Sequence, residues 1–413
     1  MSERIAGTAR PSARIVRLAN FVTPSSGGLR TALHQLGAGY LAAGHEPVLV
    51  IPGPAYRDEF TAQGRVITLP GPVVPRSGGY RVLLGRRRIA RLLTTLAPDR
   101  IEVSDRSTLR WTGEWARRTG TRSVMVSHES LDGLLGLAGP ALRPAADRLN
   151  ARTAASYDRI VCTTAWAAAE FARIGAPNLT QVPLGVDLTH FHPGRYDRDL
   201  RRSYADPTEL LLFHCGRLSP EKKPERSVAA LAELRARGVP AVLVIAGDGP
   251  LRERMQASAA RARLPVWFLR YVADRNVLAR LLATADVVLA PGPIETFGLA
   301  ALEALASGTP VVVSAQSALP EVTGSAGLAA DGDGPAYADA IQELAVRPRA
   351  DRRAEARRRA ERYPWSAAVA GFLRAHDLTP GPGEVRSLRP VRTGQSYRTS
   401  PDPGTRGGNA ASR

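Results

Sequence analysis

The sequence is poor in sulfur and in lysine. Its 413 residues include 2 cysteines, 3 methionines and, among 56 basic residues, only the lysines Lys222 and Lys223. Cys162 and Cys215 lie far apart, form no Cys-x-x-Cys pair and each fall within an apolar run. This spacing is typical of buried structural thiols in a reducing compartment, so we expect a cytoplasmic protein.

Long hydrophobic runs are also missing. No apolar stretch approaches the roughly 18–20 residues that span a bilayer, and the N-terminal segment lacks the apolar core of a signal peptide. Hydrophobic residues nevertheless make up 44% of the chain, which is ordinary for a globular protein. A chain of 413 residues is long enough for two domains of roughly 150–200 residues each.

The net charge of +18 comes almost entirely from arginine. Against that background, the two lysines stand side by side in the stretch GRLSPEKKPE. A compact ammonium group interacts with ligands differently from a planar guanidinium group. The lysine pair is therefore either a chance cluster or a feature that a ligand requires.

Short apolar runs alternate with helical segments along the whole chain. The runs are rich in Val, Ile and Leu, which is typical of strands buried on both faces of a parallel sheet. The alternation begins near residue 13 and restarts near residue 208, so it predicts two doubly wound, Rossmann-like α/β domains that face each other across a cleft. The predicted parts are an N-terminal domain at 13–187, a linker at 188–209, a C-terminal domain at 210–362, a last helical segment at 363–378 and a disordered basic tail at 379–413.

Several candidate site residues follow predicted strands, at the sheet edge where α/β proteins bind ligands. Ser26-Gly27-Gly28 follows the first strand and opens a helix, so its backbone can approach an anion, although a plain tight turn explains it equally well. His128 ends another strand, where a histidine can donate a hydrogen bond or accept a proton, or can be structural.

Two cations follow the first strand of the second half. Arg217 and Lys222 lie in CGRLSPEKKP, directly after the strand LLLFHCG. Positive groups at this edge suit a diphosphate. A solvated loop is the alternative.

The stretch IETFGLAALE at 294–303 places two acids around the start of a predicted helix. We expect Thr296 to cap a helix that begins near Phe297, which leaves the first backbone amides free to hold phosphate. Glu295 can reach a bound sugar, and Glu303, on the second turn, can accept hydrogen bonds from a ribose diol. Alternatively, Glu295 only favours the helix dipole and Glu303 only solvates the helix.

Taken in order, these pieces resemble the retaining glycosyltransferases of the two-domain GT-B type. The resemblance is to family 4 (group 1), which contains sucrose synthases and bacterial α-mannosyltransferases, and it runs from about residue 14 to 378. It is carried by Gly27-Gly28, VPLGVDLTHFHP (182–193), GRLSPEKKP (216–224), GDGP (247–250) and the pair Glu295-x7-Glu303.

The resemblance implies where a nucleotide-sugar binds and how it reacts. The first domain would hold the acceptor and the second the donor, with the helix at 363–378 crossing back to the first domain. Cations and amides would neutralise the diphosphate, Glu303 would hold the ribose, backbone groups near Arg270 would hold the base, and His128 and Glu295 would contact the sugar. The implied catalytic residues are His128, Arg217, Lys222 and Glu295, and the implied donor site comprises Gly27, Gly28, Arg217, Lys222, Arg270, Tyr271, Val272, Glu295, Thr296, Phe297, Gly298, Leu299 and Glu303.

The resemblance also implies that the reaction needs no metal and no cofactor. The cations and amides would replace the metal that other transferases hold with an Asp-x-Asp motif. Asp331-Gly332-Asp333 spells that motif, but it lies in a turn that leads into a helix, and we interpret it as a loop. Substitution would take place on one face of the sugar with retention, and the leaving phosphate would draw the proton from the acceptor.

The acceptor is indicated by a basic segment. Residues 76–122 contain 12 Arg and 4 acidic residues, a net charge of +8, and the stretch 80–98 has apolar residues at near-helical spacing. Such a helix either contacts an anionic membrane peripherally or packs on the first sheet in the ordinary way. No aromatic-rich nucleic-acid-binding module accompanies the charge, so we expect no nucleic-acid partner.

Within the family, NFVTPSSGGLRTAL (20–33), SGGY (77–80) and SHESLD (127–132) look most like phosphatidylinositol mannosyltransferases. This likeness implies GDP-mannose as donor and a phosphatidylinositol mannoside or other membrane lipid or glycan as acceptor, at the inner face of the membrane. Two alternatives stay open. The same chemistry could serve a soluble acceptor such as a polyol or secondary metabolite, or the protein could bind nucleotide-sugars without catalysis.

Overall fold

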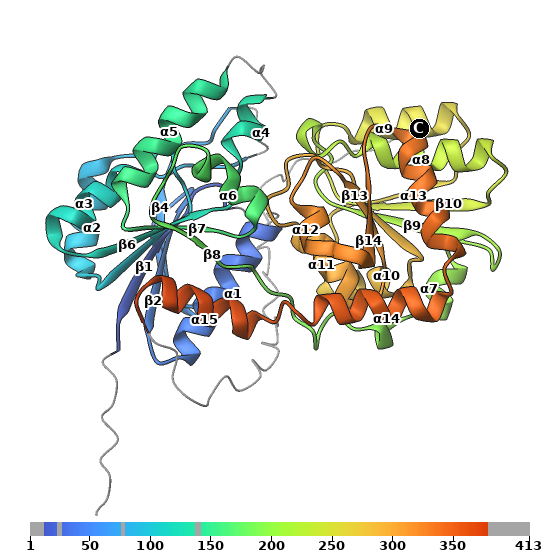
Figure 1. Cartoon of the computed structure of the whole chain (residues 1–413). Helices are drawn as coiled ribbons and strands as arrows, with labels where there is room; N and C mark the ends of the chain where they lie inside the picture. The colour runs from blue at the N-terminus through green and yellow to red at the C-terminus, as the bar shows by residue number, and fades with distance from the viewer. Residues whose placement is uncertain (1–11, 23–26, 76–78, 137–141, 379–413) are drawn as a thin grey trace, which may run out of the picture.

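The structure is a computed structural model that describes residues 12–22, 27–75, 79–136 and 142–378. Two sheets lie side by side, and each is covered by helices on both faces (Figure 1). This arrangement confirms the predicted α/β class with two doubly wound domains. Ser26, Ser77 and Gly78 of SGGY, and the predicted tail at 379–413 lie outside the described residues.

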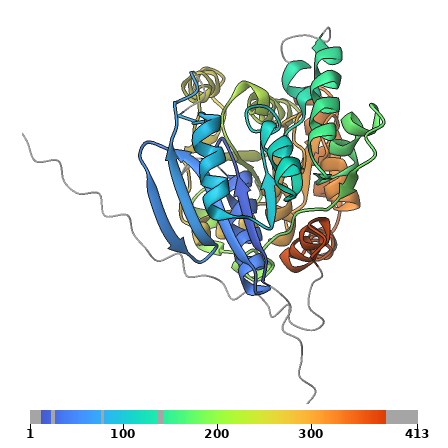
Figure 2. The ribbon, with the colours of Figure 1, turned by 90° about the vertical axis from the view of Figure 1, so that its left-hand side faces the viewer.

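The first sheet has 8 strands in the order β3-β4-β2-β1-β5-β6-β7-β8. All neighbours are parallel except β3 and β4, which form an antiparallel hairpin at one edge (Figure 2). The sequence pattern missed β3 because all its residues are exposed, so no apolar period marks it. The strands are β1 (Arg14–Leu18), β2 (Glu46–Gly53), β3 (Arg57–Thr61), β4 (Gly64–Pro70), β5 (Arg100–Val103), β6 (Arg122–Ser127), β7 (Arg159–Cys162) and β8 (Leu179–Gln181).

The second sheet has 6 strands in the order β11-β10-β9-β12-β13-β14, and all its neighbours are parallel. Its central strands are apolar on both faces; every residue of β10 is buried, for example. This is the pattern expected where helices cover both faces of a sheet. The strands are β9 (Leu210–Cys215), β10 (Ala241–Ala246), β11 (Val266–Leu269), β12 (Val287–Ala290), β13 (Val311–Ser314) and β14 (Gly327–Ala330).

Helices that cover the sheets bury an apolar stripe, as α13 shows. In α13, Tyr337, Ile341 and Leu344 recur at helical spacing and are all buried. The helices are α1 (Gly28–Ala42), α2 (Arg86–Leu96), α3 (Trp111–Thr119), α4 (Leu131–Gly136), α5 (Arg143–Ser156), α6 (Ala165–Ala172), α7 (Arg198–Arg202), α8 (Glu225–Ala236), α9 (Arg252–Arg261), α10 (Arg275–Thr284), α11 (Leu299–Ala306), α12 (Leu319–Thr323), α13 (Gly334–Val346), α14 (Arg349–Ala360) and α15 (Trp365–Ala375).

Both sheets reverse their strand order at one point. In the first sheet the chain moves outward from β1 to one side and from β5 to the other, and in the second sheet β9 and β12 play the same parts. Ligands of open α/β sheets bind in the crevice beyond the carboxyl ends of the strands at this reversal. The loops after β1, β5, β9 and β12 are therefore where a site is expected.

The last helix, α15, packs against α1 of the first sheet (Figure 1). The contact is close, because a β-carbon added to Gly39 would lie only 2.2 Å from Cγ2 of Val369. Just before α15, the Tyr363 carbonyl accepts a backbone hydrogen bond of 2.8 Å from the Val186 N–H. The exact domain boundaries at 187, 209 and 362 stay predictions.

A buried charged network also holds α15. Glu102 accepts a hydrogen bond of 2.7 Å from Arg17 Nε and one of 2.6 Å from the Tyr40 hydroxyl, and its second oxygen lies 3.1 Å from Nε2 of His376. Every one of these side chains is buried. The network joins β1, β5 and α1 to the residue that follows α15.

Among the described residues, none of the helices combines the length and the apolar character needed to cross a membrane.

Candidate active site

Lys222 and Glu295 meet beyond the carboxyl ends of β9 and β12. Lys222 ends a 3-10 turn at Pro220–Lys222, and Glu295 lies in the loop that follows β12. Because the two strands are neighbours, Lys222 Nζ comes within 2.6 Å of Glu295 Oε1. Their side chains remain 30% and 28% exposed, so a ligand can still reach both.

Close backbone packing fixes the loop that carries Arg217 and Lys222. A β-carbon on Gly247 would lie 1.9 Å from the Gly216 carbonyl oxygen, and one on Gly249 would lie 2.4 Å from the carbonyl oxygen of Leu218. Only glycine permits such approach, which gives the GDGP stretch a structural reason. Arg252, which the sequence reasoning missed, donates a hydrogen bond of 2.9 Å to the Gly247 carbonyl.

The helix after Glu295 begins later than predicted. Helix α11 starts at Leu299, and its N-cap is Gly298 in the left-handed conformation, with φ of 78° and no side-chain cap. The prediction that Thr296 caps a helix beginning near Phe297 was wrong, because the Thr296 hydroxyl donates instead to the His128 carbonyl, at 2.8 Å. Among the described residues, the amides of Gly298 and Leu299 have no acceptor.

The start of α11 borders a small pocket of about 40 Å³ that opens to solvent. The start of α1 lies near the start of α11, since a β-carbon on Gly28 would be 3.8 Å from Cδ1 of Leu299. The positive ends of two helices thus approach each other, and Gly298 at the start of α11 lines the pocket together with Lys222. The pocket is lined by His214, Cys215, Gly216, Lys222, Ala290, Pro291, Gly292, Glu295, Gly298, Ala300, Ala301 and Leu319.

Arg217 lies outside this lining, held by groups from both domains. Its guanidinium forms an ion pair of 2.5 Å with Glu221 and lies 5.2 Å from the ring centroid of Tyr80, which belongs to the first domain. Its side chain is 41% exposed. Arg217 is therefore placed at the interface of the domains, where a bound anion can compete for its donors.

His128 follows β6 in the first domain and is half-buried. Burial, with the charges of Arg17 and Arg106, lowers the pKa of His128 to about 4, against the opposing charge of Glu102. The imidazole is therefore neutral at pH 7 and can act as a hydrogen-bond donor without carrying charge. Arg106, which sequence reasoning also missed, fixes the His128 loop by donating to the Glu129 carbonyl and to Ser127 Oγ.

Glu303 lies on α11 as predicted, but it is buried and has a partner that the sequence did not reveal. Arg275 of α10 approaches it at 3.3 Å. Burial raises the pKa of Glu303, and the Arg275 charge opposes that shift. Burial, together with the Glu303 charge, raises the pKa of Cys215, which lines the pocket, to about 12.

The predicted base-binding residues lie at the outer part of the same sheet edge. Arg270, Tyr271 and Val272 form the loop after β11, where Tyr271 is 47% exposed and Arg270 lies 3.4 Å from Asp248. They do not line the pocket. Gly27, the N-cap of α1, is likewise outside the lining and has open space around it.

The Asp-x-Asp stretch forms the turn between β14 and α13, as interpreted from the sequence. Asp333 precedes α13 and lies 3.3 Å from Arg226, and Asp331 accepts a hydrogen bond from Gln316. In the part of the chain that the structure describes, no group of three or more His, Cys, Asp or Glu side chains is arranged to hold a metal ion.

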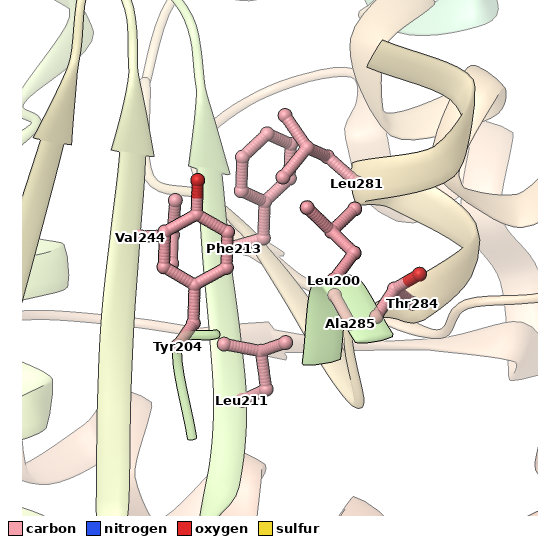
Figure 3. A pocket seen from close by; sticks show the side chains of 8 residues that line it. All are labelled: Leu200, Tyr204, Leu211, Phe213, Val244, Leu281, Thr284 and Ala285. Atoms are coloured by element: carbon pink, nitrogen blue, oxygen red, sulfur yellow. The ribbon is translucent and has the colours of Figure 1, made fainter. Parts of the chain in front are cut away.

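A second hollow, too small to hold a water molecule, lies in the second domain (Figure 3). Apolar side chains of the linker, the sheet and α10 converge on it, and the Thr284 hydroxyl accepts a hydrogen bond from the Asp197 amide. We interpret it as packing space. It is lined by Leu200, Tyr204, Leu211, Phe213, Val244, Leu281, Thr284 and Ala285.

Known families match both halves of the chain. Residues 27–185 match the model described as "Glycosyl transferase 4-like domain", and residues 197–363 match "Glycosyl transferases group 1". Among solved structures, sucrose-phosphate synthase from Thermosynechococcus elongatus has a TM-score of 0.73 at 21% identity and covers 88% of this chain and 98% of its own. HepE of Anabaena in complex with UDP and glucose has a TM-score of 0.70 at 18% identity, with coverage of 88% and 99%. At such identities these likenesses support the fold.

Curated relatives are closer in sequence. The "GDP-mannose-dependent alpha-(1-6)-phosphatidylinositol dimannoside mannosyltransferase" of Mycobacterium tuberculosis is 52% identical over 364 residues, which cover 87% of this chain and 95% of the relative. A "GDP-mannose-dependent alpha-mannosyltransferase" of Mycolicibacterium smegmatis is 28% identical over 72% of this chain and 79% of its own length. The chain therefore belongs to the group 1 (family 4) glycosyltransferases and is an enzyme of that family with the two-domain GT-B fold.

Proposed function

We propose that the enzyme transfers mannose from GDP-mannose to a phosphatidylinositol dimannoside, through an α-(1-6) linkage and with retention at the sugar. The donor, acceptor and linkage are those in the name of the mycobacterial relative that shares 52% identity. The structural observation that carries the transfer chemistry is the pocket in which Lys222, Glu295 and the start of α11 at Gly298 come together.

That pocket suits a departing diphosphate. When the bond between the sugar carbon and the phosphate oxygen breaks, negative charge grows on the diphosphate and positive charge on the sugar. Free amides at the start of α11, the start of α1, Lys222 and Arg217 are already in place, so they stabilise the new negative charge with little reorganisation. These groups supply the positive charge that a metal ion supplies in other transferases, and we propose that no metal takes part.

The remaining site residues orient the reacting parts. Glu295 contacts the mannose and holds Lys222 in place, Glu303 accepts from the ribose, and backbone groups near Arg270 hold the base. The neutral His128 donates a hydrogen bond to the sugar from the first domain. The acceptor hydroxyl bonds to the sugar carbon on the face that the diphosphate leaves, and its proton passes to a diphosphate oxygen.

The donor can be tested by thermal shift with GDP-mannose, UDP-glucose and ADP-glucose at equal concentration. A ligand at 100 times its Kd stabilises a folded protein by about 2.7 kcal/mol, so we expect GDP-mannose to raise Tm by about 5–10 °C. The other two nucleotide-sugars should give less than half that shift. A larger shift with a uridine or adenosine donor would contradict the proposal.

Release of GDP distinguishes an enzyme from a binding protein. A non-catalytic nucleotide-sugar binder would show the same thermal shift but would release no GDP when it is mixed with donor and dimannoside. A transferase with a soluble acceptor would release GDP with a small polyol and would be indifferent to the lipid.

Helix α2 belongs to the basic segment from which the sequence predicted a lipid acceptor. Its apolar residues Ile89, Leu93 and Leu96 are buried in the core of the first domain, so they are not available to dip into a bilayer. The opposite face is basic, and Leu84, just before the helix, is 55% exposed. Four arginines of α2 are exposed and have no partner among the described residues: Arg86, Arg87, Arg88 and Arg91.

We propose that this face contacts anionic lipid electrostatically at the inner surface of the membrane. Each basic residue close to such a surface contributes about 1 kcal/mol. The triple variant Arg86→Glu, Arg87→Glu, Arg91→Glu should therefore bind anionic liposomes at least about tenfold more weakly in flotation. The matched control reverses three other exposed arginines, Arg254→Glu, Arg261→Glu and Arg358→Glu. Equal loss in both variants, or no flotation of the wild type, would remove α2 from the proposal.

A further inference from the structure

Thr296 joins the two domains at the centre of the proposed site. Its hydroxyl donates a hydrogen bond of 2.8 Å to the His128 carbonyl, and its own carbonyl accepts from the hydroxyls of Thr163 at 3.2 Å and Thr164 at 2.9 Å. All three partners belong to the first domain, at the carboxyl ends of β6 and β7. Thr296 is only 8% exposed, and both partner threonines are 1% exposed, so water does not replace these bonds.

Thr296 lies in the chain between two parts of the donor pocket. It directly follows Glu295, which pairs with Lys222 in the pocket, and it lies two residues before Gly298, the N-cap of α11. Consecutive Cα atoms are 3.8 Å apart, so any shift of Thr296 moves Glu295 and the first amides of α11 with it. One hydroxyl therefore couples the donor pocket of the second domain to the His128 loop of the first.

A second contact between the domains stands apart from the pocket. Glu321 of α12 accepts hydrogen bonds from the amides of Ala165, at 2.9 Å, and Trp166, at 3.1 Å, at the start of α6. It also accepts from the Gln181 amide group at 2.9 Å. Glu321 holds the domains together without touching His128 or Glu295, so it separates the effect of general domain contact from that of Thr296.

We infer that Thr296 is a positioning residue that sets the distance between His128 and the free backbone amides at the start of α11. Through this distance it affects the rate of sugar transfer. The inference rests on the proposed transfer reaction, in which groups of the two domains must meet around one sugar. Reacting atoms must come within about 3–3.5 Å, and small misplacements of the supporting groups lower rates steeply. Donor affinity is set mainly by the pocket within the second domain, so it should change little.

The matched variants are Thr296→Val, which keeps the shape of the side chain but removes the hydroxyl, and Thr296→Ser, which keeps the hydroxyl. We expect Thr296→Val to lower kcat about tenfold, with KM for GDP-mannose within about twofold of the wild type. Thr296→Ser should restore kcat to within about threefold of the wild type. If Thr296 only stabilised the fold, Thr296→Val would not lower kcat while leaving KM unchanged, and Thr296→Ser would not restore kcat.

Glu321→Ala is the control for domain contact. It should lower kcat less than Thr296→Val, because the His128 carbonyl keeps its hydrogen bond to the Thr296 hydroxyl of the second domain. An equal loss of kcat in Glu321→Ala, or an unchanged kcat in Thr296→Val, would overturn the inference. If Thr296→Val does not fold, Thr163→Val, which removes one of the two hydroxyls that donate to the Thr296 carbonyl, is tested by the same criteria.

Amide hydrogen exchange measures, without any substrate, whether the hydrogen bond of Thr296 restrains the His128 loop. In the full-length protein, the amides of residues 127–133 should exchange faster in Thr296→Val than in Thr296→Ser, because the loop has lost its bond to the second domain. Identical exchange in the two variants would overturn the inference. If the wild type transferred no mannose while the exchange differed as expected, the proposed function would fail and the coupling of the two domains through Thr296 would stand.

Discussion

Replacing Lys222 with alanine is expected to lower kcat by about 100- to 1,000-fold, the loss seen when one preorganised group that stabilises transition-state charge is removed. Lys222 lines the pocket, and its ammonium group is 2.6 Å from Glu295. Both side chains are about one-third exposed, so the ion pair contributes little to folding and Tm should change by no more than about 2 °C. Steady-state transfer of mannose from GDP-mannose measures the effect.

Glu295→Gln should lower kcat to a similar extent, because the uncharged amide no longer fixes the ammonium of Lys222. The double variant Lys222→Ala, Glu295→Gln should then lose little more than either single variant, as expected for residues that act as one unit.

The neighbouring lysine is the matched control. Lys223 has a positive φ of 47° and lies outside the pocket lining, so Lys223→Asn keeps the backbone preference while removing the charge. This variant should keep kcat within about twofold of the wild type. If Lys223→Asn lost as much activity as Lys222→Ala, total positive charge rather than the placed ammonium would carry the reaction, and our account of the pocket would be wrong.

The second large effect concerns stability. Glu102→Met is expected to cost about 3–5 kcal/mol, since it leaves the buried charge of Arg17 without its partner. Arg17 and Glu102 are each 1% exposed and 2.7 Å apart. The midpoint of urea unfolding, with the slope compared between variants, measures the loss. The double variant Arg17→Met, Glu102→Met removes both charges and should be more stable than Glu102→Met alone, and the opposite order would contradict this account.

The same network makes stability depend on pH. Burial by itself raises the pKa of Glu102, but the Arg17 charge and the hydrogen bonds from His376 and Tyr40 outweigh burial and hold the pKa well below its ordinary value of 4.5. A lowered carboxyl pKa contributes stability that is complete above the unfolded-state pKa and is lost as pH falls toward the folded-state pKa.

Glu102→Gln isolates this contribution, because the amide does not titrate. The stability difference between the wild type and this variant should stay constant from pH 7 to 5 and then shrink by about 1.4 kcal/mol per pH unit below the ordinary pKa. Urea midpoints measured at each pH follow the difference. A difference that stays constant down to pH 3 would show that Glu102 is not an ionised partner of Arg17.

The sequence predicted those parts of the fold and site that depend on short stretches of chain. Buried parallel strands appear as runs of Val, Ile and Leu, and the site residues lie in the segments after them, so Lys222, Glu295 and His128 could be assigned to the carboxyl-end edges of their sheets. Strand β3 escaped because all its side chains are exposed. The start of α11 was misplaced because Thr296 is a favourable cap by residue type, whereas its hydroxyl is used by a carbonyl 168 residues away in the chain.

Contacts between distant segments were outside the reach of sequence patterns. Arg275 beside Glu303, Arg252 on the Leu269 carbonyl and the Arg17–Glu102 pair each join elements that only the tertiary structure brings together. In an arginine-rich sequence, no local pattern distinguishes an arginine that is buried in an ion pair from one that is exposed to solvent. The basic helix α2 illustrates this, since only the structure separates its exposed arginines from its packed leucines.

The sequence alone determined the α/β class, the repeat of two doubly wound halves and the residues of the GRLSPEKKP and IETFGLAALE stretches, because strand burial and motif spacing are local properties. The tertiary structure decided which side chains meet: Lys222 with Glu295, Gly28 with Leu299, and Thr296 with His128. Lys222 meets Glu295 because β9 and β12 are neighbours where the second sheet reverses its order, and the other two pairs form because loops of the two domains face each other.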